Sequence, residues 1–303
     1  MAAITKRRRP SGVQLAEWRD GWLFASPFLL GVLFFWVGPM LYSLFLVTQD
    51  WDMLGAPQFI GLGNIRRILE DELVRKSLGN TAYYTFIGVP IQLLIALLLA
   101  VALNQDLRGR SFYRTVFYLP AITPAVASAV VWNQIFNADF GVLNNILRLF
   151  GHPGIKWLFE PSVAKPAFIL MSLWGIGPQM VIFLAGLQNV PAELLEAAQI
   201  DGATPWQRFW SVSLPILSPV LFFNFVIGII GSFQVFTNAF VMTNGGPQNA
   251  TLFMVLYIYL NAFRFFRMGY AATLAWMLFW IIMFFTFLQF RIGNRLVYYE
   301  GKV

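Results

Sequence analysis

The stretch Pro191–Pro219, PAELLEAAQIDGATPWQRFWSVSLPILSP, is a polar-containing insert between two fully apolar segments of the 303-residue chain, and its local sequence signals all agree. Pro191 suits a first helical position, acidic residues follow in the next turns, and Gly202 suits a helix end, so a short helix is predicted between them. Thr204 and Gln207 have the spacing of a capping box and predict a second helix. The insert therefore predicts a helix, a tight turn and another helix.

The middle of the first helix reads Glu196-Ala197-Ala198. Small side chains let another backbone approach closely, and a carboxylate at residue 196 reaches a cationic group on a partner. In a membrane protein such a helix could receive force from another subunit. The alternative is an interfacial helix pair that only joins two spans.

The composition indicates a polytopic membrane protein. Hydrophobic residues make up 58% of the chain and charged residues 12%, against roughly 25% charged residues in soluble domains. The chain has no cysteine, which excludes disulfides and thiolate chemistry. The single histidine, His152, follows a glycine in a loop and is interpreted as a solvated residue rather than a metal ligand. The net charge of +7 comes from basic residues beside apolar segments, which favours membrane orientation over nucleic-acid binding.

The apolar segments predict six membrane-spanning helices, because a helix needs about 20 residues to cross a ~30 Å core. The predicted spans are residues 21–47, 81–103, 116–136, 166–187, 217–240 and 271–290. Pro120 and Pro124 predict a kink in the third span. The apolar run Thr251–Phe263 is too short to cross and predicts a helix at the outer interface that packs on the bundle; the alternative is that this run crosses as well.

Two connections between the spans have predicted features of their own. In Thr48–Asn80, Asn64 is predicted to cap a surface helix whose apolar residues share one face. These apolar residues are Ile65, Ile68, Leu69 and Leu73. The connection Asn137–Lys165 is predicted to be a polar loop outside the membrane.

Basic residues predict that both ends of the chain lie in the cytoplasm. Residues 1–20 contain Lys6 and four arginines ahead of the first span, and Lys and Arg are more frequent on the predicted inner side. A signal peptide is the alternative, but the apolar run Gly21–Val47 is far longer than the roughly 7–15 residues of a signal-peptide core.

The six predicted spans contain no Asp, Glu, Lys, Arg or His. This argues against ion coupling and against an intramembrane enzyme, since both place ionisable groups within the membrane. The chain also lacks a phosphate-binding GxxxxGK loop, a HExxH pair and a GxSxG elbow, so neither ATP hydrolysis nor proteolysis is assigned to it. Uphill transport would need energy from another subunit, and an uncharged pathway favours an uncharged or well-screened cargo.

Glu196-Ala197-Ala198, Gly202 after three residues, and then Val212-Ser213-Leu214-Pro215 resemble the EAA motif of permease subunits of bacterial ABC importers. Val212 stands where the family usually has Ile. The chain is also similar to the carbohydrate-uptake branch, the maltose-type or glycerol-3-phosphate-type permeases. That similarity covers FIGLGNIRRIL from Phe59, FYLPAITPAVASAVVWNQIF from Phe117, GVLNNIL from Gly141, LAGLQNVPAELLEAAQIDGA from Leu184, TNGGPQNAT from Thr243, and VYYEG at 297–301, which resembles the first of two permeases.

The resemblance implies an all-α, six-transmembrane-helix permease of a type I importer. A cytoplasmic segment, residues 1–20, would precede a permease domain, residues 21–303, whose coupling loop 190–215 docks on an ATPase. The implied coupling residues are Glu196, Ala197, Ala198, Asp201 and Gly202. The implied partners are a second permease subunit, two copies of a cytoplasmic ATPase that hold ATP and Mg²⁺, an extracytoplasmic sugar-binding protein and the lipid bilayer of the cell's inner membrane, with no nucleic acid. No catalytic residue, metal site or cofactor is predicted on this chain.

The resemblance also places a substrate pathway halfway through the membrane. Its implied residues are Gly175, Gln179, Gly231, Ser232, Gln234, Val235 and Asn238. The sequence supports this in part, because Gly231, Gln234 and Asn238 have helical spacing and sugars need polar partners beside aromatic faces such as Phe233 or Phe236. The alternatives are that these residues only join helices, or that the partner permease makes the main contacts.

The predicted cargo is a sugar, oligosaccharide or polyol. The alternatives are glycerol-3-phosphate, a glycerophosphodiester or another small nutrient, and, in a different class, a structural subunit that does not transport.

Overall fold

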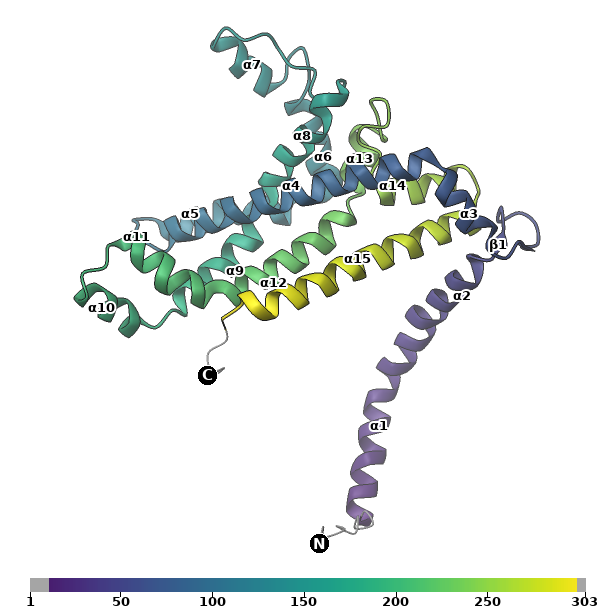
Figure 1. Ribbon diagram of the computed structural model, residues 1–303, viewed down its shortest axis with the longest axis horizontal. Coiled ribbons are helices and arrows are strands. Elements are labelled where there is room, and N and C mark those ends of the chain that lie inside the picture. Colours follow the sequence, from purple (N-terminus) through teal and green to yellow (C-terminus); the bar gives the residue numbers. More distant parts are fainter. Residues whose placement is uncertain (1–10, 299–303) are drawn as a thin grey trace.

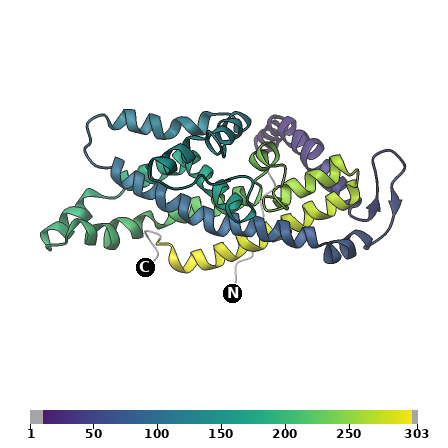
Figure 2. The same ribbon diagram turned by 90° about the horizontal axis from the view of Figure 1, so that it is seen from above.

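The computed structural model describes residues 11–298, and their regular secondary structure is almost entirely helical (Figures 1 and 2). The first half contains α1 Gly12–Val32, η1 Leu33–Val37, α2 Gly38–Leu46, β1 Gln49–Asp50, β2 Gln58–Phe59, α3 Gly63–Glu70, α4 Glu72–Leu103, α5 Arg110–Ile122, α6 Ala125–Ile135 and α7 Val142–Leu149. The second half contains α8 Pro161–Ser172, η2 Leu173–Gly175, α9 Gly177–Gln188, α10 Ala192–Ile200, α11 Pro205–Arg208, η3 Phe209–Ser213, α12 Leu214–Phe233, α13 Thr237–Met242, α14 Met254–Tyr259, η4 Leu260–Arg264 and α15 Met268–Leu296. The predicted basic residues 6–9 and the end of the VYYEG segment lie outside the described residues.

The lengths of the helices confirm the predicted all-α membrane fold. Four helical segments in the described part of the chain are long and apolar enough to cross a membrane: Gly12–Leu46, Glu72–Leu103, Pro205–Met242 and Met268–Gly293. Two further pairs qualify when each pair is taken together, Arg110–Ile122 with Ala125–Ile135 and Pro161–Gly175 with Gly177–Gln188. Counting each bent pair as one span gives six.

The predicted kink of the third span is a sharp bend of 101° between α5 and α6. Thr123 is extended there, with φ −71° and ψ 128°, because the ring of Pro124 disfavours helical geometry in the residue before it. The two arms then contact different partners: α5 packs on α9 and α6 packs on α13. The third span is therefore two differently directed helices rather than one kinked rod.

The predicted fifth span, residues 217–240, lies within the candidate span Pro205–Met242, but its helix is interrupted. Helix α12 ends at Phe233 and α13 begins at Thr237, with Phe236 between them at φ −138° and ψ −63°. The Gln234 side chain donates from Nε2 to the Ile230 carbonyl at 3.1 Å. This local bond supplies a partner to a carbonyl at the end of the helix, as polar side chains near helix termini commonly do.

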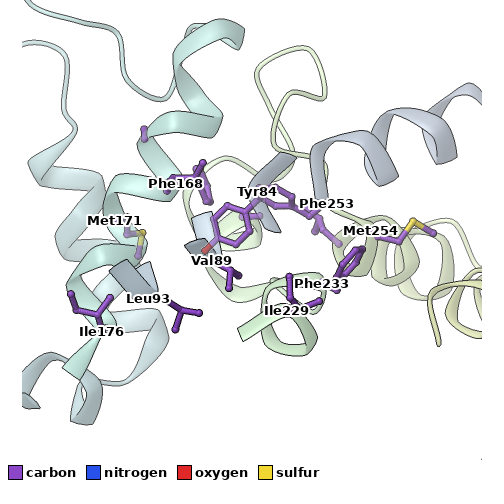
Figure 3. Packing of buried hydrophobic residues seen from close by; sticks show 14 of the residues in the cluster. Tyr84, Val89, Leu93, Phe168, Met171, Ile176, Ile229, Phe233, Phe253 and Met254 are labelled. Atoms are coloured by element: carbon purple, nitrogen blue, oxygen red, sulfur yellow. The ribbon is translucent and has the colours of Figure 1, made fainter. Parts of the chain in front are cut away.

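Helix α4 is the centre of the packed core, since it contacts α8, α9, α12 and α14. Its Val89 and Leu93 lie close to Met171 of α8 and Ile229 of α12 in a continuous apolar cluster (Figure 3). Tyr84 packs against Phe253, the residue before α14, with ring centroids 5.3 Å apart. The predicted short helix at 251–263 is confirmed as α14 and η4, and its packing on the bundle is confirmed by the burial of Met254 and Leu256.

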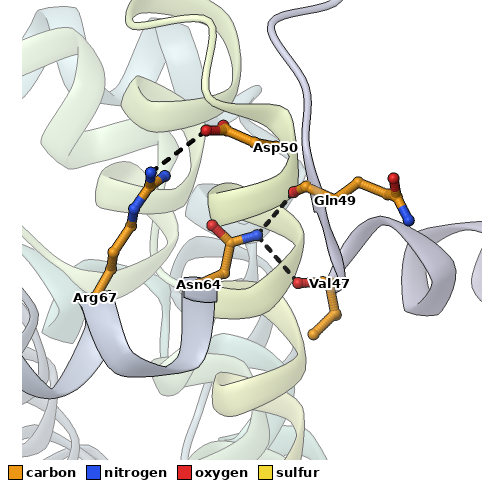
Figure 4. A network of polar contacts seen from close by, with 5 residues as sticks. All are labelled: Val47, Gln49, Asp50, Asn64 and Arg67. Carbon is orange, nitrogen blue, oxygen red and sulfur yellow. Dashed lines mark hydrogen bonds and ion pairs between the residues drawn. The ribbon is translucent and has the colours of Figure 1, made fainter. Parts of the chain in front are cut away.

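The prediction that Asn64 caps a helix is wrong. The N-cap of α3 is Leu62, and Asn64 lies inside the first turn. Its Nδ2 donates to the carbonyls of Val47 at 3.0 Å and Gln49 at 2.8 Å, so it ties α3 to the end of α2 and to β1 (Figure 4). The predicted apolar face is also mostly uncovered, because Ile68 is buried while Leu69 is 73% exposed.

The connection 137–165 is more ordered than the predicted polar loop. It contains α7 and the start of α8, and it folds around the buried amide of Asn144. That amide donates to the Ala138 and Ile155 carbonyls, both at 2.9 Å, and accepts from Trp157 Nε1 at 2.9 Å. His152 is exposed, as expected for a solvated loop residue.

Helix α1 lies apart from the rest of the molecule (Figure 1). Only 6% of the apolar window in Gly12–Leu46 is buried within the chain, and α2 rather than α1 packs on α15. Most of this apolar helix therefore faces surroundings that other molecules or lipid must provide.

Candidate coupling loop and translocation pathway

The predicted helical hairpin is confirmed, and Gly202 ends its first helix. Gly202 has φ +83°, a left-handed conformation that favours glycine. Its N–H donates to the Gln199 carbonyl at 3.0 Å, and the N–H of Ala203 donates to the Ala198 carbonyl at 2.9 Å. This pair of bonds is a Schellman motif. Pro191 lies one position earlier than predicted, at the N-cap of α10.

The second helix of the hairpin begins with the predicted capping box. The Thr204 N–H donates to Gln207 Oε1 at 2.8 Å, and the Gln207 N–H donates to Thr204 Oγ1 at 3.3 Å. The α11 turn then runs through η3 into α12 without a loop. Because of this continuity, a displacement of the hairpin is transmitted directly to the start of α12.

The predicted coupling residues form an exposed surface at one extremity of the molecule (Figure 1). Glu196, Ala197, Asp201 and Gly202 are exposed, and Ala198 is half-buried. Among the described residues, no ion pair or side-chain hydrogen bond involves Glu196. Large apolar side chains flank this surface, with Ile200 86% exposed and Trp206 69% exposed. An exposed apolar patch with an unpaired carboxylate is typical of a protein-binding surface.

One glutamine joins the two helices of the hairpin, and a second glutamine precedes the hairpin and contacts α5. Arg208 Nη1 of α11 donates to Gln199 Oε1 of α10 at 2.9 Å. When the Gln188 amide is oriented with its oxygen toward α5, that oxygen accepts from Arg110 at 2.6 Å and from Arg114 at 2.8 Å. Gln188 is the last residue of α9 and directly precedes the hairpin. We call the group Arg110, Arg114 and Gln188 the amide clasp. The i, i+4 arginines were visible in the sequence, but their shared acceptor was not.

Ser232 is the most buried of the predicted pathway residues. Its Oγ lies 2.9 Å from Thr85 Oγ1 of α4 and 3.0 Å from the Ile229 carbonyl. These contacts match the alternative in which polar residues join helices. Phe233, considered as a sugar platform, is 2% exposed and stacks on Phe285 at 5.6 Å, so it belongs to the core.

The other predicted pathway residues lie at two breaks in the helices. Gly175 ends η2 at the 51° bend of the fourth span and is exposed. Gln179, half-buried at the start of α9, has a buried Oε1 with no hydrogen-bond partner among the described residues. Gly231 and Gln234 are exposed, and Val235 and Asn238 are half-buried. The predicted single stripe is wrong, since the break after Phe233 separates Gly231 from Asn238.

A polar cluster that the sequence analysis missed closes the opposite end of the bundle. Asp71, the N-cap of α4, accepts hydrogen bonds from the hydroxyls of Tyr257 and Tyr270, the latter at 2.6 Å. Burial opposes ionisation of Asp71, but the hydrogen bonds from the two hydroxyls and from the backbone outweigh it and lower the pKa of this carboxyl. Burial, together with Asp71, raises the pKa of Tyr257 to about 12. The partners are almost 200 residues apart, so no local pattern signals this cluster.

These features define a class of protein. The chain is a polytopic helical membrane protein with predicted spans free of charged residues and with an exposed helical hairpin between two of them. Residues 77–298 match the family model described as a binding-protein-dependent transport system inner membrane component. The chain belongs to this family.

Relatives along nearly the whole chain are permeases. The chain is 43% identical over 287 residues to the probable ABC transporter permease protein YesP of Bacillus subtilis, covering 93% of both chains. It is 37% identical over 280 residues to the lactose transport system permease protein LacF of Rhizobium radiobacter, covering 89% of this chain and 93% of LacF. It is 31% identical over 286 residues to the trehalose/maltose transport system permease protein MalF of Thermococcus litoralis, covering 94% of this chain and 97% of MalF.

The fold matches a solved structure. A chain of a bacterial alginate ABC transporter, in complex with an alginate pentasaccharide-bound periplasmic protein, superposes with a TM-score of 0.81 at 22% identity, covering 91% of this chain and 95% of that chain. At this identity the likeness shows the fold. The chain is thus an ABC importer permease subunit in a multi-pass membrane assembly, and ATP hydrolysis belongs to partner subunits.

Proposed function

We propose that this chain is one permease subunit of an ATP-driven importer for a sugar, oligosaccharide or polyol. Its relatives support the cargo class: their names specify lactose, trehalose and maltose, and, at 31% identity, arabinooligosaccharides. An extracytoplasmic binding protein would deliver the cargo. The single observation that carries the proposal is the exposed α10–α11 hairpin, which joins directly onto a membrane-spanning helix.

In the proposed mechanism the hairpin is the coupling element. Two copies of a cytoplasmic ATPase would bind ATP and Mg²⁺, and one would dock on Glu196, Ala197, Ala198, Asp201 and Gly202. Closure of the ATPase pair moves α10, and α11 and η3 pass the movement to α12. Cargo-loaded binding protein favours the same arrangement from the other side, so the two ligands are thermodynamically linked.

A coupling role for the hairpin would give the chain one orientation in the cytoplasmic membrane. With α10 inside and six spans, both termini would lie in the cytoplasm, an orientation that the basic residues near the N-terminus also favour. Residues 1–20 would be a cytoplasmic segment, residues 21–303 the permease domain and residues 190–215 the coupling loop. The connection after α13 would face the extracytoplasmic side.

The second permease would cover the surfaces that this chain leaves open. Helix α1 has few contacts within the chain, and Gly175, Gly231 and Gln234 are exposed. In a heterodimer these residues, with Gln179, Val235 and Asn238, would line a pathway between the two permeases. Ser232 would support this pathway by holding α12 against α4.

Glycerol-3-phosphate is a second cargo, favoured by one relative. The chain is 34% identical over 284 residues to the sn-glycerol-3-phosphate transport system permease protein UgpA of Agrobacterium fabrum. Uptake by the reconstituted transporter, measured with labelled glycerol-3-phosphate beside labelled saccharides, distinguishes the two cargo classes.

Replacing Glu196 by Lys tests the coupling role. We expect Glu196→Lys to insert into the membrane normally and to abolish the ATP hydrolysis that cargo-loaded binding protein stimulates, because the unpaired carboxylate meets the ATPase. The matched control is Glu193→Lys, an exposed residue in the first turn of the same helix. Stimulated hydrolysis at the wild-type rate in Glu196→Lys would remove this role.

A further inference from the structure

A cavity of about 410 Å³ lies between α13 and η4. Helix α13 follows the end of α12 that is remote from α10 (Figure 1). It is lined by three aromatic rings, one aliphatic side chain, one amide and one guanidinium. These belong to Phe240, Asn244, Tyr259, Leu260, Phe263 and Arg264. The volume falls within the roughly 300–1,000 Å³ of small-molecule sites, and none of these residues belongs to the coupling loop or the predicted pathway.

Aromatic rings form one wall of the cavity. Phe236 and Phe240 stack with centroids 5.3 Å apart and planes 16° from parallel. Tyr259 contacts Phe240 at 5.2 Å and Phe263 at 5.2 Å. Phe240 remains 39% exposed and Phe263 57% exposed. Because the rings hold one another in place, they offer a preorganised apolar surface to a ligand.

Two polar side chains complete the lining. Asn244 is exposed at a positive φ of 47° in the connection after α13. Arg264 is exposed at the end of η4, and within residues 11–298 no carboxylate lies within 4.0 Å of it. The guanidinium offers five N–H donors to hydroxyl or carboxylate oxygens, and the amide both donates to such oxygens and accepts from a hydroxyl.

The frame of the cavity is fixed by the chain itself. The η4 segment is a π-turn, closed by the Phe265 N–H donating to the Leu260 carbonyl at 2.9 Å. It carries Leu260, Phe263 and Arg264 to the cavity, and single π-turns are frequent at functional sites. On the other side, Lys76 Nζ donates to the Gln248 carbonyl at 2.6 Å and so ties the connection after α13 to α4.

We propose that this cavity is a saccharide-binding subsite at the extracytoplasmic mouth of the transporter. The CH face of a sugar ring packs on Phe240 and Phe263, and its hydroxyls or carboxylate bond to Asn244 and Arg264. The proposal rests on the proposed function for its orientation and cargo class. Aromatic and basic residues also anchor helices at membrane interfaces, but here the rings contact one another around a hollow that an amide also lines.

The test uses the complete transporter, with both permeases, ATPase and binding protein, in proteoliposomes. We expect Phe263→Ala to raise the KM for saccharide uptake about 2- to 12-fold, the range of one lost aromatic contact, with a smaller change in maximal rate. Arg264→Gln should also raise the KM, because it removes hydrogen-bond donors to the sugar. The control Phe265→Ala removes a neighbouring ring that is 50% exposed but does not line the cavity, and it should keep the wild-type KM.

Saturation-transfer NMR on the same assembly without binding protein gives a second readout, with lactose as a neutral probe and digalacturonate as an acidic one. Signal transfer to a probe in wild type and its loss in Phe263→Ala supports the subsite. Loss in Arg264→Gln for digalacturonate alone assigns the guanidinium to a carboxylate, and loss for both probes assigns it to hydroxyls.

Three results separate the possible failures. If wild-type transporter imports saccharides while both cavity variants keep its KM and its NMR signals, the subsite is wrong and the proposed function stands. If the wild-type transporter imports no saccharide, the proposed function is wrong, and the subsite that rests on it is wrong too. If the variants differ from wild type only in vesicles that contain anionic phosphatidylglycerol, Arg264 binds a lipid headgroup and the saccharide proposal is overturned.

Discussion

The connection at the coupling end, residues 190–215, presents most of its first helix to the surroundings, whereas the connection at the opposite end, residues 243–253, is tied to the bundle. None of the residues of α10 is buried. In contrast, Leu252 and Phe253 are buried, and Asn80 of α4 donates to the carbonyls of Asn249 at 2.8 Å and Leu252 at 3.1 Å.

This difference indicates which end needs other subunits. A connection whose polar groups are satisfied within the chain keeps its shape alone, so it can present a preformed surface. A connection with exposed apolar side chains and an unpaired carboxylate is completed by a partner, and it is free to move with that partner. Variants at the two ends should therefore fail in different assays.

The largest expected effect on stability lies at the opposite end, where α15 meets β1. A side chain at Gly269 would overlap the Gln49 carbonyl oxygen. We expect Gly269→Val to lower the free energy of unfolding by about 3 kcal/mol, as overpacking does when backbone must move. Thermal unfolding of the detergent-solubilised transporter measures this. Gly79→Val is the control, because a side chain there meets open space, and equal melting temperatures for the two variants would contradict the tight contact.

The next effect concerns assembly rather than folding. Ile200 is 86% exposed beside the coupling residues. We expect Ile200→Asp to weaken ATPase binding about 30-fold, the effect of losing an interface hot spot of ~2 kcal/mol, and to change the stability of the chain by less than about 0.5 kcal/mol. Leu54→Asp, at an equally exposed position between β1 and β2, should leave ATPase affinity unchanged. Similar affinities for both variants would remove the assigned interface.

A smaller effect is expected from the amide clasp. Gln188→Leu removes the acceptor shared by Arg110 and Arg114. The loss should destabilise the observed position of the hairpin by about 1–2 kcal/mol. We expect fewer molecules transported per ATP hydrolysed, with unchanged ATPase binding. Gln188→Glu restores an acceptor and should restore the ratio. A normal transport-to-hydrolysis ratio in Gln188→Leu would show that the clasp plays no part in coupling.

The features that the sequence predicted correctly depend on neighbouring residues. The hairpin follows from the spacing of Thr204, Gln207 and Gly202, whose caps are satisfied within a few positions. The bend of the third span follows from Pro124. The length of apolar segments predicts the spans because the bilayer requires about 20 residues whatever their partners.

The features that the sequence did not reveal depend on distant contacts. Asn64 looks like a cap, but its amide bonds to residues 15 and 17 positions earlier. No glycine or proline lies at residues 234–236 to indicate the break in the helix after Phe233. The aromatic cavity joins residues on both sides of the 243–253 connection, and the exposed state of Glu196 is meaningful only because nothing in the described chain folds over it.

The smallest expected effect is a pH dependence of stability at the opposite end of the bundle. The pKa of Asp71 is lowered by hydrogen bonds from Tyr257, Tyr270 and the backbone, against the opposing effect of burial. A lowered pKa means that this carboxylate stabilises the folded chain above its unfolded pKa of about 3.9, and that the stabilisation is lost as the pH falls through the folded value. Since Asp71 is only half-buried and solvent screens its charge, the contribution should be below about 1 kcal/mol.

The variant Asp71→Asn tests the direction of this pH dependence. At pH 7 the variant should melt slightly below wild type, and the gap should close as the pH falls below about 4. Tyr270→Phe removes one of the two hydroxyl donors and should show part of the same behaviour. The coupling end should not respond, so ATPase affinity at pH 7 should equal that of wild type in both variants. A difference in melting temperature that stays constant between pH 7 and pH 3 would mean that the Asp71 charge does not hold α4 to α14 and α15. The order of that end of the bundle would then depend only on the Asn80 hydrogen bonds and the apolar core.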